Sequence, residues 1–95
     1  MPGQATTASR TLEIINKRGL HARASSKFVK LVEGFHSTVT VSRDGVTVHG
    51  TSIMGLMLLA AGPGCHIEVT ADGADAEEAL DAIAALVADR FGEGE

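Results

Sequence analysis

A histidine and an arginine two residues apart, His21 and Arg23, lie where the chain is expected to change from a turn to a helix. A neutral imidazole is a competent nucleophile near pH 7, and an arginine can hold phosphate oxygens through its planar guanidinium. The first turn of a helix adds free backbone N–H groups and the positive end of the helix dipole, which favour an anion. Together these features predict a histidine that accepts and donates a phosphoryl group.

A histidine at such a place also suits a simple helix cap or an ordinary surface residue, so the charge around it matters. Five of the eight basic residues fall in residues 17–30, and no Asp or Glu occurs from Ile14 to Val32. Nine of the twelve acids lie from Glu68 onward, in a chain of net charge −4. This concentration of positive charge around His21 favours an anionic ligand or an acidic partner surface.

The elements that position His21 can be predicted from apolar spacing. Residues 10–15 alternate as a first strand, with Leu12 and Ile14 on the inner face, and Gly19 supplies the turn. A helix is expected from just after His21 to about residue 32, with Gly34 ending it. Its apolar residues recur at three- and four-residue spacing: Phe28, Leu31, Val32 and Phe35.

The rest of the chain predicts three more strands and two more helices. Residues 38–42 and 46–49 alternate with period two around an Asp-Gly hairpin turn, and residues 66–70 form the fourth strand. Asp72-Gly73 is expected to turn the chain. Residues 53–60 or so predict a short helix that the Gly-Pro-Gly of residues 62–64 ends. A capping box of Asp75 and Glu78 opens the last helix, whose buried stripe is Leu80, Ile83, Leu86, Val87 and Phe91.

The element order β-α-β-β-α-β-α favours an α+β open-faced two-layer sandwich, a mostly antiparallel sheet with helices on one face. Residues 10–91 are expected to form this single domain. Residues 1–9 are interpreted as a flexible lead-in and residues 92–95 as a flexible acidic tail.

The second helix has more apolar residues than a two-layer domain can bury. Some of Ile53, Met54 and Met57 should therefore remain exposed, and exposed methionine-rich surfaces tend to bind partners. The alternative is that neighbouring helices cover them.

Ser52 precedes this helix as its expected N-cap, and its hydroxyl is also a candidate for regulatory phosphorylation. A phosphate there would suit the helix dipole but repel an acidic partner.

Other classes of function find little support. His36, His49 and His66 show no metal-type spacing with His21, and Cys65 beside His66 is too little for a zinc site. A negative net charge without interleaved aromatic residues argues against nucleic-acid binding. One cysteine gives no intrachain disulfide, the longest apolar run is far short of the ~20 residues of a membrane helix, and residues 1–9 have no signal-type core. We expect a cytoplasmic monomer without metal or cofactor.

Two motifs resemble one family. Residues 19–23 (GLHAR), followed by residues 26–29 (SKFV), look like the active-site signature of HPr, the histidine-containing phosphocarrier of the phosphoenolpyruvate-dependent phosphotransferase system. Residues 50–57 (GTSIMGLM) are similar to that family's regulatory-serine segment. The resemblance extends from residue 10 to residue 91.

This resemblance implies a sheet order of 1-4-2-3 with three helices on one face. It implies that His21 accepts a phosphoryl group from enzyme I on Nδ1, passes it to an enzyme IIA protein or domain, and is assisted by Arg23. The protein would be a stoichiometric carrier without independent turnover. Ser52 matches a serine modified by a dedicated kinase/phosphorylase in some members. The implied partner-binding residues are Ala22, Ser26, Lys27, Lys30, Ile53, Met54 and Met57.

One departure is Ala24, where many sugar-branch members carry proline. Alanine is similar to what nitrogen-related and regulatory relatives carry, which favours that regulatory branch. The main alternative function is a regulatory HPr-like binding module that acts through phosphorylated Ser52. The retained His21 and Arg23 argue against a purely regulatory role. A small metallo-enzyme or hydrolase has no support from ligand spacing.

Overall fold

The computed structural model describes residues 6–94. Four strands form one antiparallel sheet in the order β1-β4-β2-β3: β1 (Thr6–Glu13), β2 (Thr38–Arg43), β3 (Val46–His49) and β4 (His66–Gly73). The helices are α1 (Ala22–Glu33), α2 (Ile53–Leu58) and α3 (Ala76–Ala88), and a 3₁₀ turn, η1 (Arg90–Gly92), follows α3. The predicted element order, strand order and open-faced architecture are confirmed.

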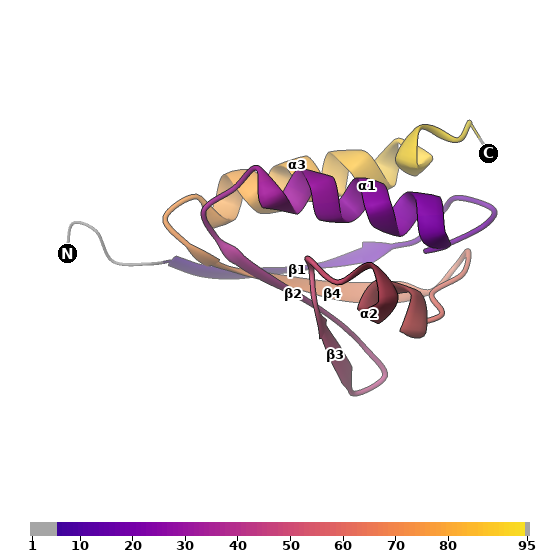
Figure 1. Cartoon of the computed structure of the whole chain (residues 1–95), viewed down its shortest axis with the longest axis horizontal. Coiled ribbons are helices and arrows are strands. Elements are labelled where there is room, and N and C mark those ends of the chain that lie inside the picture. The colour runs from indigo at the N-terminus through magenta and orange to yellow at the C-terminus, as the bar shows by residue number, and fades with distance from the viewer. Residues whose placement is uncertain (1–5, 95) are drawn as a thin grey trace.

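The helices α1 and α3 lie side by side over one face of the sheet, and α2 packs beside α1 near β3 (Figure 1). Alternation along the strands supplies the sheet's half of the core: Val39, Val41, Ile67, Val69 and Ala71 are all at most 3% exposed. Burying these side chains against the helices is the main favourable term for the fold. The helices contribute Ala24, Phe28, Val32, Leu56, Leu80, Ile83 and Val87.

The N-terminal boundary differs from the prediction. Residues 6–9, expected in a flexible lead-in, form the first half of β1, while residues 1–5 lie outside the described part of the chain. Polar side chains hold this half on β4: Thr7 donates to Asp72 Oδ1 at 3.1 Å, and the hydroxyls of Ser9 and Thr70 are 2.9 Å apart. Cross-strand pairs of this kind stabilise a sheet, and they are invisible in a search for apolar alternation.

Two other predicted boundaries need correction, and a third is confirmed. Asp72-Gly73 is not a turn but the end of β4, paired with Thr7 and Thr6. The helix expected over residues 53–60 ends at Leu58. Gly34 follows α1 as expected but has φ −79°, so it ends the helix without a left-handed conformation.

The predicted capping box at the start of α3 does not form. Asp75 occupies the N-cap position, but its side chain makes no capping hydrogen bond to the helix. Its carboxylate instead accepts from the backbone N–H of His36 at 2.8 Å and from the hydroxyl of Ser37 at 2.6 Å. Asp75 therefore ties α3 to the connection between α1 and β2.

These hydrogen bonds predict a pH-dependent contribution to stability. The His36 N–H and the Ser37 hydroxyl hold the pKa of Asp75 below its ordinary value. A carboxyl group whose pKa is lower in the folded state stabilises the protein above its unfolded pKa of about 3.9, and this contribution is lost as the pH falls through the folded pKa. Asp75→Asn should be less stable than the wild type at pH 7 in urea unfolding, and the difference should shrink in acid.

The matched control is Glu78→Gln, which removes the exposed carboxylate that the capping box would have used. It should unfold like the wild type at both pH values. Equal losses for the two variants at pH 7 would mean that a capping box does form.

Candidate functional site

His21 is the N-cap residue of α1, as the sequence predicted for the start of this helix. Its backbone is extended, with φ −74° and ψ 179°, and its carbonyl accepts the Ser25 N–H at 2.9 Å. The ring atom Nδ1 accepts from the backbone N–H of Arg23 at 3.3 Å. The imidazole therefore lies against the free N–H groups of the first turn, where the helix dipole favours negative charge.

The loop before His21 is held by a buried asparagine. Asn16 is 0% exposed and donates from Nδ2 to the carbonyl of Gly19 at 2.9 Å. Leu20 donates its N–H to the Ala61 carbonyl at 3.0 Å, and its own carbonyl accepts from the Ser25 hydroxyl at 3.2 Å. These bonds fix the backbone on both sides of the histidine.

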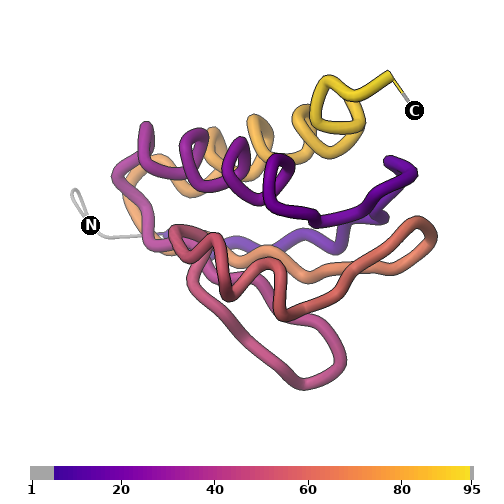
Figure 2. The backbone as a smooth tube through the Cα atoms, turned by 45° about the vertical axis from the view of Figure 1, so that its right-hand side comes forward, coloured from indigo at the N-terminus to yellow at the C-terminus, as the bar shows by residue number. Residues whose placement is uncertain are grey.

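The C-terminal turn lies beside this loop, a contact that the sequence analysis missed (Figure 2). Glu93, expected in a flexible tail, places Oε2 in hydrogen-bond contact with His21 Nε2 and accepts from Asn16 Nδ2 at 3.0 Å through Oε1. The turn is fixed by the fully buried Phe91, whose carbonyl accepts from Lys27 Nζ at 2.6 Å. No local pattern signals this contact, because 72 residues separate Glu93 from His21.

The surroundings of Glu93 keep its carboxylate ionised. Burial works to raise the pKa of Glu93, but the hydrogen bonds from Asn16 and His21 and the positive charge of Arg18 outweigh it, so the pKa lies below its ordinary value. Favourable hydrogen bonding to the charged form is the usual cause of such a shift.

Basic side chains gather next to this pair. Arg18, Arg23 and Lys27 line a hollow of about 310 Å³ together with Gly92 and Glu93, which we call the basic hollow. The structure thus brings together three of the five basic residues of the predicted segment, whereas Lys17 and Lys30 do not line the basic hollow. Exposed basic side chains around a single histidine suit an anionic group.

The other candidate residues of α1 follow His21 along the helix. Ala22 is exposed in the first turn, Ser26 is half-buried in the second, and Lys30 is exposed in the last. Ala24, the departure from the family pattern, is 0% exposed and packs into the core.

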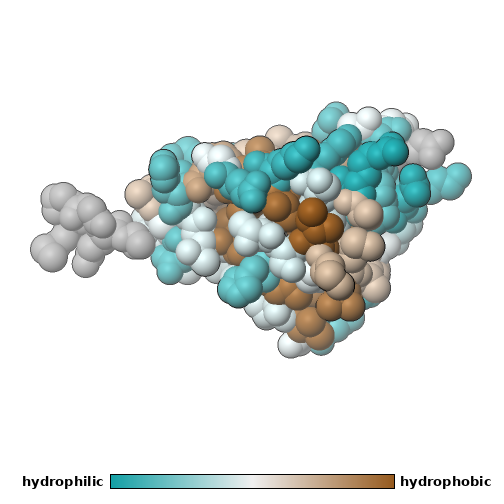
Figure 3. Space-filling view, viewed as in Figure 1, coloured by the Kyte–Doolittle hydropathy of each residue, from teal (hydrophilic) through white to brown (hydrophobic). Residues whose placement is uncertain are grey.

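An apolar surface adjoins the histidine on its other side. A second hollow of about 260 Å³ runs from Arg18 and His21 to Met57 and residues 60–62. Four apolar side chains of α2 remain exposed, and hydrophobic atoms gather over α2 in Figure 3. We call them the α2 patch: Ile53 (39% exposed), Met54 (75%), Met57 (43%) and Leu58 (76%). The predicted exposure of this helix is confirmed, and Leu58 joins the three residues named from the sequence.

Ser52 is the N-cap of α2, as predicted. Its Oγ accepts from the backbone N–H of Gly55 at 2.9 Å. The hydroxyl is half-buried and lies at the edge of the α2 patch, next to Ile53.

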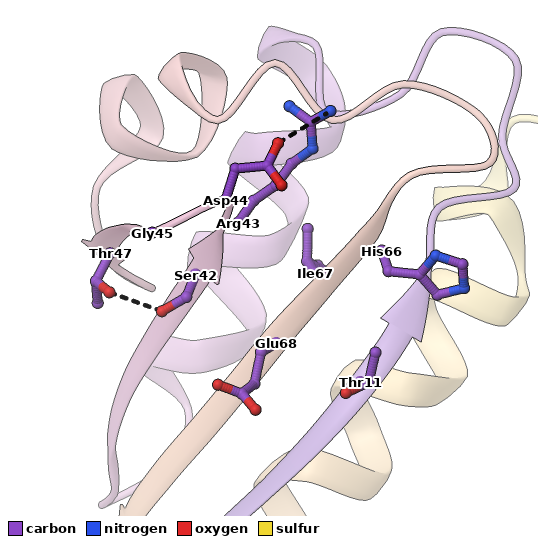
Figure 4. A pocket seen from close by; sticks show the side chains of 9 residues that line it. All are labelled: Thr11, Ser42, Arg43, Asp44, Gly45, Thr47, His66, Ile67 and Glu68. Carbon is purple, nitrogen blue, oxygen red and sulfur yellow. Dashed lines mark hydrogen bonds and ion pairs between the residues drawn. The ribbon is translucent and has the colours of Figure 1, made fainter.

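A larger hollow of about 470 Å³ lies away from His21, on the sheet face that the helices leave open (Figure 4). Its polar side chains interact with one another: the hydroxyls of Ser42 and Thr47 are 2.7 Å apart, and Arg43 Nη2 forms an ion pair with Asp44 Oδ2 at 3.7 Å. Arg43 also donates to the Leu59 carbonyl at 2.8 Å. We assign this hollow no role.

Within residues 6–94, no three His, Cys, Asp or Glu side chains are grouped as a metal site requires. Among the same residues, no helix has the length and apolar character needed to cross a membrane.

Comparison with known proteins agrees with this geometry. A family model described as "PTS HPr component phosphorylation site" matches residues 8–89. The phosphocarrier protein HPr of Cupriavidus necator is 55% identical over 86 residues, which cover 90% of this chain and 97% of the relative. The phosphocarrier protein NPr of Proteus mirabilis is 40% identical over 88 residues, which cover 92% of this chain and 98% of the relative.

A solved structure agrees as well. HPr-C-His from Thermoanaerobacter tengcongensis has a TM-score of 0.86 to this chain at 41% identity, covering 90% of this chain and 97% of its own. The match of the phosphorylation-site model across both motifs and all four strands, together with these relatives, shows that the chain belongs to the HPr family of phosphocarrier proteins of the phosphotransferase system.

Proposed function

We propose that His21 accepts a phosphoryl group from phospho-enzyme I and passes it to an enzyme IIA protein or domain. The observation that carries this proposal is the place of His21: a helix N-cap between the basic hollow and the α2 patch, in a chain of the HPr family. Phosphoryl transfer depends mainly on positioning and charge stabilisation. A small carrier needs only the nucleophile, the anion site and a partner surface, because the partner enzymes supply the rest.

The proposed partner surface combines charge with apolar contact. Lys27 and Lys30 of α1 offer positive charge to an acidic partner, while the α2 patch offers exposed apolar area. Ala22 and Ser26 belong to the same helix as the two lysines, and we include both in the proposed surface. A shared surface of this kind would serve enzyme I and enzyme IIA in turn, and we propose that the protein acts as a cytoplasmic monomer without a cofactor.

The direct test is intact-mass spectrometry after incubation with phosphoenolpyruvate, Mg²⁺ and enzyme I. We expect one phosphate that is lost on acid treatment, and its transfer to enzyme IIA when that protein is added. An acid-stable phosphate formed on Ser52 from ATP and cell extract, with no acid-labile phosphate from enzyme I, would instead support the regulatory binding module.

Arg23 is proposed to hold the transferred phosphoryl group. Its guanidinium is exposed in the first turn of α1 and lines the basic hollow. A hydrogen bond to a charged group contributes about 1.5–3 kcal/mol, which corresponds to about a 10- to 150-fold slower transfer in Arg23→Ala. Quench-flow transfer rates and the affinity for enzyme I should be measured together, because we expect the rate to fall more than the affinity. An unchanged rate would remove this role.

Ser52 is proposed as a regulatory phosphorylation site for a serine kinase/phosphorylase. Ser52→Ala loses the bond to the Gly55 N–H and should cost about 1 kcal/mol of stability in urea unfolding, because that cap is removed. The rate at which enzyme I phosphorylates His21 should be the same in Ser52→Ala as in the wild type. Ser52→Asp keeps an N-cap acceptor and adds negative charge beside the α2 patch, so it should remain stable but react more slowly with enzyme I. Equal rates for both variants would contradict a regulatory effect of charge here.

A further inference from the structure

The two ring nitrogens of His21 have different partners. Nε2 contacts a carboxylate oxygen of Glu93, which as an ionised group only accepts hydrogen bonds. Nδ1 contacts the backbone N–H of Arg23 at 3.3 Å, which only donates. Both contacts require the same neutral tautomer of the ring, with the proton on Nε2 and the lone pair on Nδ1.

We propose that Glu93 is a positioning residue for His21: its carboxylate holds the Nε2–H tautomer and so leaves the Nδ1 lone pair to attack the phosphoryl group. This inference rests on the proposed function of His21 as the phosphoryl acceptor. It assigns a role to the C-terminal turn, which neither the motifs nor the family match reaches, since the family model ends at residue 89.

The carboxylate is held in place before any partner binds. Asn16, itself 0% exposed, donates to Glu93 Oε1 at 3.0 Å and so fixes which oxygen faces the histidine. The turn that carries Glu93 is anchored by the buried Phe91, whose carbonyl accepts from Lys27 at 2.6 Å. The side chains of His21 and Glu93 are only 17% and 14% exposed, so water competes weakly for their contact.

The contact also suits the charge that develops during transfer. As the Nδ1 lone pair forms the new N–P bond, the bond between phosphorus and its donor on enzyme I breaks, and that electron pair returns to the donor. The ring keeps its Nε2 proton and gains a positive charge, which the negative charge of the adjacent Glu93 carboxylate stabilises. Onward transfer to enzyme IIA breaks the N–P bond and returns the electron pair to Nδ1, so the ring is neutral again and no proton has moved.

Two substitutions separate positioning from other roles of Glu93. In Glu93→Gln, the Asn16 amide should select the Gln oxygen, which leaves the Gln NH₂ facing Nε2 and favours the wrong tautomer, with the proton on Nδ1. Phosphorylation by enzyme I should then slow about 10- to 150-fold, the range for loss of a charged hydrogen bond. Glu93→Ala imposes no tautomer, and the Arg23 N–H still favours a lone pair on Nδ1, so its rate should lie between those of the wild type and Glu93→Gln.

The tautomer of the His21 ring is the decisive measurement, because a purely structural role of Glu93 would leave it unchanged. ¹⁵N NMR of the unphosphorylated ring should show Nε2–H in the wild type and in Glu78→Gln, an exposed carboxylate control on α3, and Nδ1–H in Glu93→Gln. The inference is overturned if the wild-type proton is on Nδ1, if Glu93→Gln keeps the wild-type tautomer, or if either Glu93 variant is phosphorylated faster, as an inhibitory contact would predict. If the wild type accepts no phosphate, the proposed function fails, while the tautomer comparison still decides whether Glu93 sets the state of the ring.

Discussion

His21→Ala should accept no acid-labile phosphate from enzyme I and should still fold. The substitution removes the proposed nucleophile, and the other three histidines, His36, His49 and His66, are exposed on other elements outside the hollows that adjoin His21. A neighbouring group is therefore not positioned to replace it. Because the basic hollow and the α2 patch are retained, the variant should still bind enzyme I and compete with the wild type for it.

The fold should tolerate this change because His21 caps α1 mainly through its backbone. The bond from the Ser25 N–H to the His21 carbonyl does not depend on the side chain. Loss of the contact with the Glu93 carboxylate and of the weak 3.3 Å bond to Arg23 should cost about 1.5–3 kcal/mol. Intact-mass spectrometry and a thermal melt would measure the two effects, with His66→Ala on the open sheet face as the control that keeps full phosphorylation. An acid-labile phosphate on His21→Ala would contradict the proposal.

Local sequence signals predicted the elements that carry their own pattern. Residues 46–49 alternate and follow an Asp-Gly turn, and they form β3 with the expected bounds. The N-cap position of Ser52 was equally local, since its hydroxyl bonds only three residues ahead. The errors occur where an interaction between distant segments replaces the local one: Asp75 bonds to residues 36 and 37 rather than to its own helix.

The candidate site was predicted from the residues of one loop and one helix, and its missing part comes from the far end of the chain. His21, Arg23 and the basic segment are contiguous in sequence, so their residue types and spacing were enough to propose a site there. Glu93 reaches the histidine only because α3 packs beside α1 and the turn after Phe91 returns the chain to the loop. An acidic Gly-Glu-Gly tail carries no pattern that distinguishes this from a solvated end.

Gly19→Ala should be the most damaging single-methyl change in the loop that positions His21. Gly19 has φ +65°, a left-handed conformation that costs a residue with a Cβ about 1–2 kcal/mol. A Cβ there would also lie 2.3 Å from the carbonyl oxygen of Ala61 and 2.9 Å from the Gly62 Cα, both backbone atoms that cannot rotate away. Overpacking of this kind adds about 1–3 kcal/mol, so we expect a total loss of about 2–5 kcal/mol in urea unfolding.

Two neighbouring glycines separate the causes of this loss. Gly64 has φ +88° with open space at its Cβ position, so Gly64→Ala should show only the conformational cost of about 1–2 kcal/mol. Gly62 has open space and no left-handed φ, so Gly62→Ala should be nearly neutral. Equal losses in Gly19→Ala and Gly64→Ala would mean that Ala61 moves aside easily.

The contact between a Cβ at position 19 and the Ala61 carbonyl also matters for phosphoryl transfer. The Leu20 N–H, one residue before His21, bonds to the same carbonyl at 3.0 Å. A methyl group that pushes this carbonyl away should displace the imidazole from Glu93 and from the Arg23 N–H. Gly19→Ala should therefore be phosphorylated more slowly than Gly64→Ala even at temperatures where both are folded.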